Sequence, residues 1–260
     1  MKKGLPILLG FVIVLTVTVV LVSSDEKGGP RITITEPNFN FGFAPEGSYM
    51  AHEYILKNTG DERLEIKRVR TTCGCASAPV KKMSLDPDEE TTVTVIFNST
   101  RYFHKTSKAA IISTNDPTRP SEKVTFIADM DTVKPRVITP EPKKINLGKG
   151  ENMNRTGTAL IRNISEQAIT VQVIDYYSEC LEEPELASID ISDVQASEAS
   201  THKVSFAVDI PIGEKAEVSF KVKEEIPTGE IVRASFTIAA MDKNGKEVTR
   251  VTIPVSGGGK

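Results

Sequence analysis

The residues with the clearest capacity for chemistry are the cysteines of a Cys73-Gly74-Cys75 motif. In a strand, side chains two positions apart point to the same face, so both sulfur atoms could meet one ligand. Three functional hypotheses follow: a Cys73–Cys75 disulfide, a soft-metal site for Cu(I) or zinc, and a thiol redox centre. An extended strand holds the two Cα atoms at about the upper limit for a disulfide, so Gly74 would have to bend the chain. The structural alternative is a pair of buried thiols that act as small apolar side chains.

A metal site at this motif would need further ligands, and the histidines are the available donors. We take His52 as the candidate that would join Cys73 and Cys75, with His104 as the other candidate, although no pattern places either one close. A Cys-x-Cys spacing alone is a weak metal signal, so we predict neither a metal nor a cofactor. The third cysteine, Cys180, is left over and is expected to be buried or to pair between chains.

The remaining polar residues form no recognisable active site. We find neither a nucleophile–base–acid arrangement nor a phosphate-binding loop. The formal net charge is −3 and tryptophan is absent. These features argue against a nucleic-acid footprint and against stacking platforms for bases or sugars. The sequence therefore predicts a protein that is not an enzyme, that binds no nucleic acid and that has no evident small-molecule substrate.

A membrane-targeting pattern precedes the globular part. Lys2 and Lys3 are followed by a nearly unbroken apolar run of 18 residues from Leu5 to Val22. About 20 apolar residues cross a hydrocarbon core, so we predict residues 1–24 as an uncleaved signal anchor, a single transmembrane helix of the cell membrane. The alternative is a cleavable signal peptide and a secreted or periplasmic protein, although the apolar region of such peptides is usually only ~7–15 residues. Both hypotheses place residues 31–260 outside the cytoplasm, after a flexible linker at 25–30.

Beyond residue 30 the hydrophobic pattern is that of strands. Apolar and polar residues alternate with a period of two in runs such as 93–97, 218–222 and 232–238. This alternation is typical of antiparallel strands with one buried face. Turn sequences separate the runs, among them Asn115-Asp116-Pro117, and Asn244-Gly245 predicts a tight hairpin. Short strands at regular spacing predict β-sandwiches.

The two halves of this region repeat each other. The segment 57–61 (KNTGD) lies 105 residues before the segment 162–166 (RNISE), and Cys75 and Cys180 fall at the same offset. Self-similarity at a domain-sized period indicates the same structural unit twice. We therefore predict two domains, at residues 31–132 and 136–257, with the boundary near Pro135, which interrupts the strand pattern.

Six motifs of the first half occur in a characteristic order: Asn40-Phe41-Gly42-Phe43, Pro45-Glu46-Gly47, His52-Glu53-Tyr54, Lys57-Asn58-Thr59-Gly60-Asp61, Thr71-Thr72-Cys73-Gly74-Cys75 and Ser113-Thr114-Asn115-Asp116-Pro117. In this order they resemble the bacterial family called domain of unknown function 1573, over about residues 32–130. That family is similar to the Hydin-like ASH domains, which have an immunoglobulin-like sandwich. The second half resembles it only through the internal repeat and lacks the Cys-Gly-Cys motif. The resemblance implies an all-β fold of two tandem immunoglobulin-like β-sandwich domains after the N-terminal helix, and it implies no particular activity.

These observations favour a non-catalytic envelope protein, an interaction or structural module displayed outside the cytoplasmic membrane. Its expected partners are other envelope proteins, which sheet edges and loops could bind, and the membrane through the N-terminal helix. The alternative is a metal- or thiol-redox-handling protein that uses Cys73 and Cys75. A ciliary or centrosomal scaffold, by analogy with Hydin-like domains, is a third hypothesis, and the export-type N-terminus argues against it.

Overall fold

The described part of the chain is built from β-strands. The computed structural model describes residues 28–130, 137–189 and 207–259, which contain eighteen strands and one short 3-10 turn, η1 (Gly150–Asn152). The prediction of an all-β fold is confirmed. The predicted helix at 1–24 and the domain boundary near 132–136 lie outside the described residues. Within the described residues, no helix has the length and apolar character needed to cross a membrane.

Residues 28–130 form the first sandwich, called sandwich 1. One of its sheets has the strand order β1-β3-β7-β5, and the facing sheet has the order β2-β9-β8-β4-β6. Neighbouring strands are antiparallel, except that β2 runs parallel to β9. The strands are β1 (Ile32–Ile34), β2 (Asn38–Phe43), β3 (Tyr49–Asn58), β4 (Leu64–Thr71), β5 (Ala76–Ser77), β6 (Ser84–Leu85), β7 (Glu90–Asn98), β8 (Thr106–Thr114) and β9 (Ser121–Asp129).

Residues 137–189 and 207–259 form the second sandwich, called sandwich 2. One sheet has the order β10-β12-β16-β14, and the facing sheet has the order β15-β13-β17-β18, with the short β11 running parallel to β18. The strands are β10 (Ile138–Glu141), β11 (Ile145–Asn146), β12 (Thr156–Asn163), β13 (Ile169–Tyr176), β14 (Glu185–Ser188), β15 (Ala207–Ile210), β16 (Lys215–Lys221), β17 (Val232–Met241) and β18 (Glu247–Gly257).

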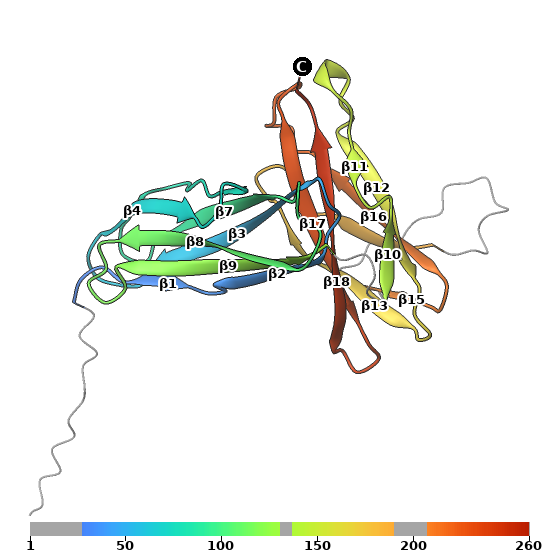
Figure 1. Ribbon diagram of the computed structural model, residues 1–260, viewed down its shortest axis with the longest axis horizontal. Coiled ribbons are helices and arrows are strands. Elements are labelled where there is room, and N and C mark those ends of the chain that lie inside the picture. Colours follow the sequence, from blue (N-terminus) through green and yellow to red (C-terminus); the bar gives the residue numbers. More distant parts are fainter. Residues whose placement is uncertain (1–27, 131–136, 190–206, 260) are drawn as a thin grey trace, which may run out of the picture.

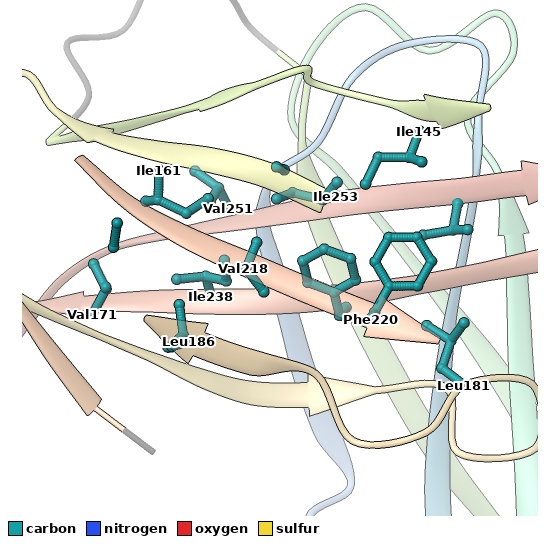
Figure 2. Packing of buried hydrophobic residues seen from close by; sticks show 14 of the residues in the cluster. Ile145, Ile161, Val171, Leu181, Leu186, Val218, Phe220, Ile238, Val251 and Ile253 are labelled. Carbon is teal, nitrogen blue, oxygen red and sulfur yellow. The ribbon is translucent and has the colours of Figure 1, made fainter. Parts of the chain in front are cut away.

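Each sandwich has its own apolar core. The rings of Phe97 and Phe126 lie 5.1 Å apart in sandwich 1, and those of Phe220 and Phe236 lie 5.5 Å apart in sandwich 2. Figure 2 shows the core of sandwich 2, with Ile161, Val218 and Phe220 among its labelled side chains. The apolar faces predicted for residues 93–97 and 218–222 are buried in these cores, which confirms the predicted phase of both strands. Each large apolar side chain buried in this way contributes about 1.5–3 kcal/mol to stability.

The internal repeat has a structural basis in two equivalent asparagines. Asn58 ends β3 and Asn163 ends β12, and both are fully buried. The side-chain amide of Asn58 donates to the backbone carbonyls of Glu62 and Leu85, and that of Asn163 donates to carbonyls of its own sandwich in the same way. Buried backbone groups outside a sheet ladder need such partners. The same residue is therefore used at the same turn of both sandwiches.

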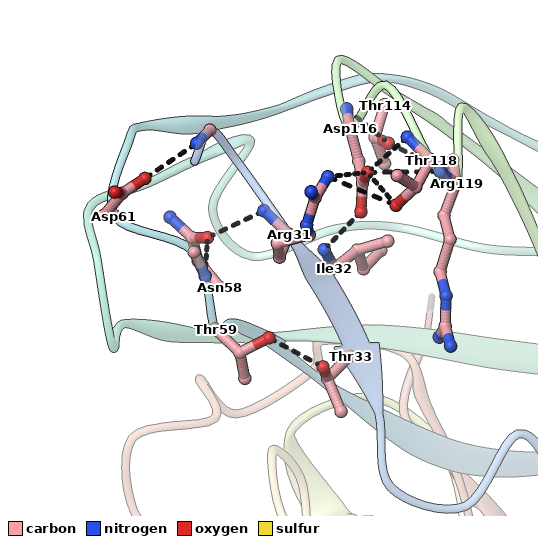
Figure 3. A network of polar contacts seen from close by, with 12 residues as sticks. Arg31, Ile32, Thr33, Asn58, Thr59, Asp61, Thr114, Asp116, Thr118 and Arg119 are labelled. Carbon is pink, nitrogen blue, oxygen red and sulfur yellow. Dashed lines mark hydrogen bonds and ion pairs between the residues drawn. The ribbon is translucent and has the colours of Figure 1, made fainter. Parts of the chain in front are cut away.

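Strand β1 is held by an aspartate from a distant turn. Asp116 lies between β8 and β9, in the turn predicted from Asn115-Asp116-Pro117, and its side chain is fully buried. Its carboxylate accepts hydrogen bonds from the Ile32 N–H at 2.9 Å, from the Thr118 hydroxyl and N–H, and from the Arg119 N–H (Figure 3). Burial raises the pKa of the Asp116 carboxyl, but these donors outweigh it and lower the pKa to about 2.

The two sandwiches share a sheet. Val251 of β18 lies opposite Phe43 of β2 in parallel pairing, and this contact joins the facing sheets into one sheet of ten strands. Sandwich 1 lies crosswise to sandwich 2, with the ends of its strands against β17 and β18 (Figure 1). Phe43 packs in the core of sandwich 2 although it belongs to a strand of sandwich 1. The chain thus interlocks the two units in one orientation.

Strand β17 is buried on both faces. The apolar face predicted for residues 232–238 packs in the core of sandwich 2, but Ser235 and Thr237, on the other face, are fully buried as well. The Ser235 hydroxyl accepts a hydrogen bond from the Ala51 N–H at 3.0 Å. The Thr237 hydroxyl lies 2.8 Å from that of Thr252, which donates to the carbonyl of Phe41 at 2.6 Å. The prediction that one face of this strand is exposed is therefore wrong for β17, because sandwich 1 covers the polar face.

Two carboxylates, those of Asp175 and Glu53, complete this junction. His52 Nδ1 lies 3.0 Å from Asp175 Oδ1, and the imidazole stacks on Phe39 with the ring centres 3.6 Å apart. The Ser178 N–H and hydroxyl both donate to the carboxylate of Glu53. Each pair joins one sandwich to the other, so the junction is specified by polar groups with fixed geometry.

Candidate functional site

The Cys73-Gly74-Cys75 motif lies in a turn between β4 and β5. A disulfide joins Cys73 and Cys75, whose Cα atoms are 5.2 Å apart. The motif is therefore not in an extended strand, the geometry that the sequence analysis started from. The turn brings the two Cα atoms closer together than an extended strand would. Gly74 is exposed at the tip, and a Cβ atom there would meet no other atom within 4 Å.

Hydrogen bonds hold this turn independently of the disulfide. The Thr71 hydroxyl lies 2.8 Å from the carbonyl oxygen of Cys73 and 3.0 Å from that of Ala76, and it donates to both. The Thr72 N–H donates to the carbonyl of Ala109, and the Ala109 N–H donates back to the Thr72 hydroxyl. The threonines that precede the motif therefore fix the loop on strand β8.

A pocket of about 520 Å³ opens beside the disulfide. Cys75 lines this pocket and also packs against the core of sandwich 1. Concave sites of a few hundred Å³ are the usual form of binding sites in proteins. The lining residues are Gly74, Cys75, Asn98, Thr100, Arg101 and Tyr102.

The pocket wall is tied to the core and to the junction. The Asn98 N–H donates to the carbonyl of Cys75 at 2.8 Å, and the Asn98 amide lies 3.4 Å from the Tyr49 hydroxyl. The guanidinium of Arg233, from sandwich 2, lies 4.3 Å from the centre of the Tyr49 ring. On the other side, the Tyr102 ring packs edge-on at 5.2 Å from Phe97 of the core. Both sandwiches thus support the pocket.

The electrostatic character of the pocket is positive. Arg101 lines it with a backbone φ of 75°, a conformation that residues other than glycine rarely adopt. Within the described part of the chain, the Arg101 guanidinium has no hydrogen bond or ion pair. The ammonium group of Lys108 lies 5.0 Å from the centre of the Tyr102 ring. Because no acidic residue is among the six that line the pocket, it suits a group with negative charge.

Residues 32–130 match the family described as Protein of unknown function (DUF1573). This segment is a DUF1573 domain. The disulfide and all six residues that line the pocket lie within it. No curated protein matches the chain.

Solved structures similar to the chain share little of its sequence. One is a protein of unknown function from Porphyromonas gingivalis W83, at 11% identity and a TM-score of 0.31, covering 88% of this chain and 100% of that one. Another is the YadV chaperone, at 10% identity and a TM-score of 0.32, covering 85% and 98%. A third is an ASH/PapD-like domain of human CEP192, at 10% identity and a TM-score of 0.32, covering 40% and 87%. At these TM-scores the similarities carry no argument.

The structure does not bring the candidate metal ligands together. In the DUF1573 domain, Cys73 and Cys75 are bonded to each other, whereas His52 faces the junction and pairs with Asp175. His104 is exposed in the loop between β7 and β8, three residues after Arg101 of the pocket. Among residues 28–130, 137–189 and 207–259, no three His, Cys, Asp or Glu side chains are grouped so that they could hold a metal ion.

Cys180 lies in sandwich 2, apart from the disulfide. Its thiol is free and half-buried, and it packs against the core of that sandwich. Burial, and then the negative charges of Glu179 and Glu230, raise the pKa of the Cys180 thiol to about 11. A thiol that stays protonated at neutral pH is a poor nucleophile.

Sequence analysis missed the residues that surround the disulfide. Asn98, Arg101 and Tyr102 come from the end of β7 and the loop after it, more than twenty residues from the cysteines. A signal was present in the run Arg101-Tyr102-Phe103-His104, because aromatic and arginine side chains in one loop are typical of binding surfaces.

Proposed function

We propose that the protein is a non-catalytic, protein-binding module of the cell envelope, made of two immunoglobulin-like sandwiches, and that its partner binds at the pocket beside the Cys73–Cys75 disulfide. One observation carries this proposal. The pocket is lined by Arg101 and Tyr102, and the next side chain along the loop, Phe103, is 60% exposed.

These side chains are of the types that dominate protein interfaces. Tyrosine and arginine are enriched among the few residues that supply most of the binding energy, and they act best around a pocket from which water is excluded. The exposed part of the Phe103 ring is in contact with solvent and is available to a partner. Covering the Phe103 ring would contribute about 1.5–3 kcal/mol of binding free energy before the cost of association.

The junction between the sandwiches supports the same proposal. A binding surface gains affinity when it is held in its bound shape beforehand. The wall of the pocket rests on Tyr49, whose ring contacts Arg233 of sandwich 2. The shared sheet and the polar junction therefore keep the surface in place without a bound partner.

Site-specific crosslinking tests where the partner binds. The full chain is expressed in its own host with a photoreactive residue in place of Phe103, and in a second strain in place of Ile212. Ile212 is the matched control because it is also 60% exposed and belongs to sandwich 2. We expect a discrete adduct from position 103 that is absent from position 212 and is lost when Arg101 is changed to alanine. Equal adducts from both positions, or no adduct from position 103, would overturn the proposal.

The location of the binding surface is part of this proposal. The basic start and the apolar run from Leu5 to Val22 favour export, with the region 31–260 outside the cytoplasm. We expect an impermeant protease added to intact cells, with the outer barrier opened where one exists, to degrade the protein. Survival of the protein until the cells are lysed would contradict this. The intact mass of the mature protein then distinguishes the anchored form, which keeps its N-terminal segment, from the cleaved form.

A further inference from the structure

The Cys73–Cys75 disulfide contributes little to holding the fold. It closes a loop with a sequence separation of two, and the restriction that a disulfide places on the unfolded chain grows with loop length. The turn is already fixed by the bonds of Thr71 and Thr72 to Cys73, Ala76 and Ala109. The loop can therefore keep its position when the two sulfur atoms are reduced, and the disulfide calls for a role other than that of a staple.

The disulfide also lies at the edge of the pocket, and both of its cysteines are half-buried. Gly74 leaves the tip of the loop uncovered, and Cys75 lines the pocket. Thiol–disulfide exchange requires a thiolate to reach one sulfur in line with the bond that breaks. A cation beside the path favours the approach of a thiolate, and Arg101 is a cation in this pocket with no ion pair in the described residues.

We propose that the Cys73–Cys75 disulfide is a reversible redox site that exchanges with a pair of thiols on a protein bound at the pocket. This inference uses the same pocket as the proposed function and adds the chemical class of the partner, a dithiol. It concerns stoichiometric exchange and needs no cofactor.

The exchange balances in two steps. A thiolate of the partner, its proton lost to water, attacks Sγ of Cys75; the Cys73–Cys75 bond breaks, and its electron pair leaves with Cys73, which takes up a proton. The second partner thiolate, its proton also lost to water, then attacks the partner's sulfur in the mixed disulfide and releases Cys75, which is protonated in turn. The partner dithiol is oxidised by two electrons to a disulfide, and Cys73 and Cys75 are reduced to two thiols.

Cys180 does not serve as the second thiol of this site. It belongs to sandwich 2 and packs against that core, and its pKa is raised to about 11. Exchange is thus confined to the pair in the DUF1573 domain, and changing Cys180 to serine gives a chain in which only this pair reacts.

Reduced glutathione tests the first step, and dithiothreitol tests the complete exchange. Both are added to the oxidised full chain carrying Cys180→Ser, purified in detergent, and the products are followed by intact mass and peptide mapping. The reference is a synthetic peptide of residues 70–78 with the same disulfide, which has the ring but not the pocket. We expect the glutathione adduct on Cys75, formed about tenfold faster than in the peptide.

Two charge variants separate the pocket from the loop. Arg101→Gln removes the cation that lines the pocket, whereas Lys105→Gln removes a cation from the same exposed loop outside it. We expect the first to slow the reaction roughly fivefold and the second to change it little. An adduct on Cys73, a rate equal to that of the peptide, or equal effects of the two variants would overturn the inference. Because these assays contain no protein partner, their failure is distinct from a failure of the crosslinking test.

Discussion

The thiol of Cys180 lies where a thiolate is unfavourable. Its pKa is raised to about 11 by burial and by the nearby glutamates, so the thiolate fraction at pH 8 is roughly 100-fold smaller than for an exposed cysteine. We expect alkylation of Cys180 by iodoacetamide at pH 8 to be slower by about this factor in the folded chain than in guanidinium. The folded rate should keep rising as the pH approaches 11. Mass spectrometry over time measures both alkylation rates. Equal rates in the folded chain and in guanidinium would contradict the half-buried position of the Cys180 thiol.

Asp116 makes a second prediction at the residue scale, about acid stability. Its pKa is about 2 in the folded chain against an ordinary value of 3.8. Because the folded carboxyl releases its proton more readily, its contribution to stability is complete above pH ~4 and is lost as the pH falls through about 2. The difference corresponds to about 2 kcal/mol.

We therefore expect the free energy of unfolding to fall by about 2 kcal/mol more in the wild type than in Asp116→Asn between pH 5 and 2. Urea unfolding at a series of pH values measures it. The comparison cancels the other carboxyl groups, which both proteins share. Stability curves that stay parallel over this range would show that the Asp116 hydrogen bonds do not favour the ionised form.

At the scale of elements, strand β2 passes into the junction through Gly42. Its φ is 64°, and a Cβ atom there would lie 2.4 Å from Cβ and from the carbonyl oxygen of Arg250 in β18. Gly42→Ala should destabilise the protein by about 2–4 kcal/mol, through backbone strain and through separation of the two strands. The matched control is Gly74→Ala, which meets no atom within 4 Å and should change stability by less than about 0.5 kcal/mol. Similar losses in the two variants, measured by urea unfolding, would contradict a close β2–β18 contact.

Local sequence patterns correctly predicted those strand faces and turns that depend only on neighbouring residues. Alternation gave the buried faces of β7 and β16, and the Asn115-Asp116-Pro117 and Asn244-Gly245 turns lie between strands as expected. Two features depend on more than local pattern. The cysteine motif lies in a turn because Thr71 and Thr72 bind the backbone around it, and the second face of β17 is buried by residues far away in the chain.

At the scale of the molecule, the junction was beyond the reach of sequence analysis. Its polar pairs join residues 123 to 211 positions apart, as in His52–Asp175 and Phe41–Thr252. The internal repeat predicted two similar sandwiches, but nothing in a repeat specifies how its copies pack. Serine and threonine on a strand are typical of an exposed face, and they are equally suited to a buried interface in which every hydroxyl has a partner.

The junction leads to a prediction about cooperativity. Ala239 is buried on the same face of β17 as Ser235 and Thr237, away from the core of sandwich 2. Ala239→Glu should therefore force the sandwiches apart without entering either core, because a carboxylate is not accommodated there without a partner. In calorimetry on the full chain we expect one thermal transition for the wild type, because the sandwiches share a sheet, and two for Ala239→Glu, because each sandwich has a core of its own. Val248→Glu, at an exposed position of the adjacent β18, is the control and should keep one transition. One transition in Ala239→Glu as well would mean that the shared ten-stranded sheet, and not the separate cores, sets the unit of folding.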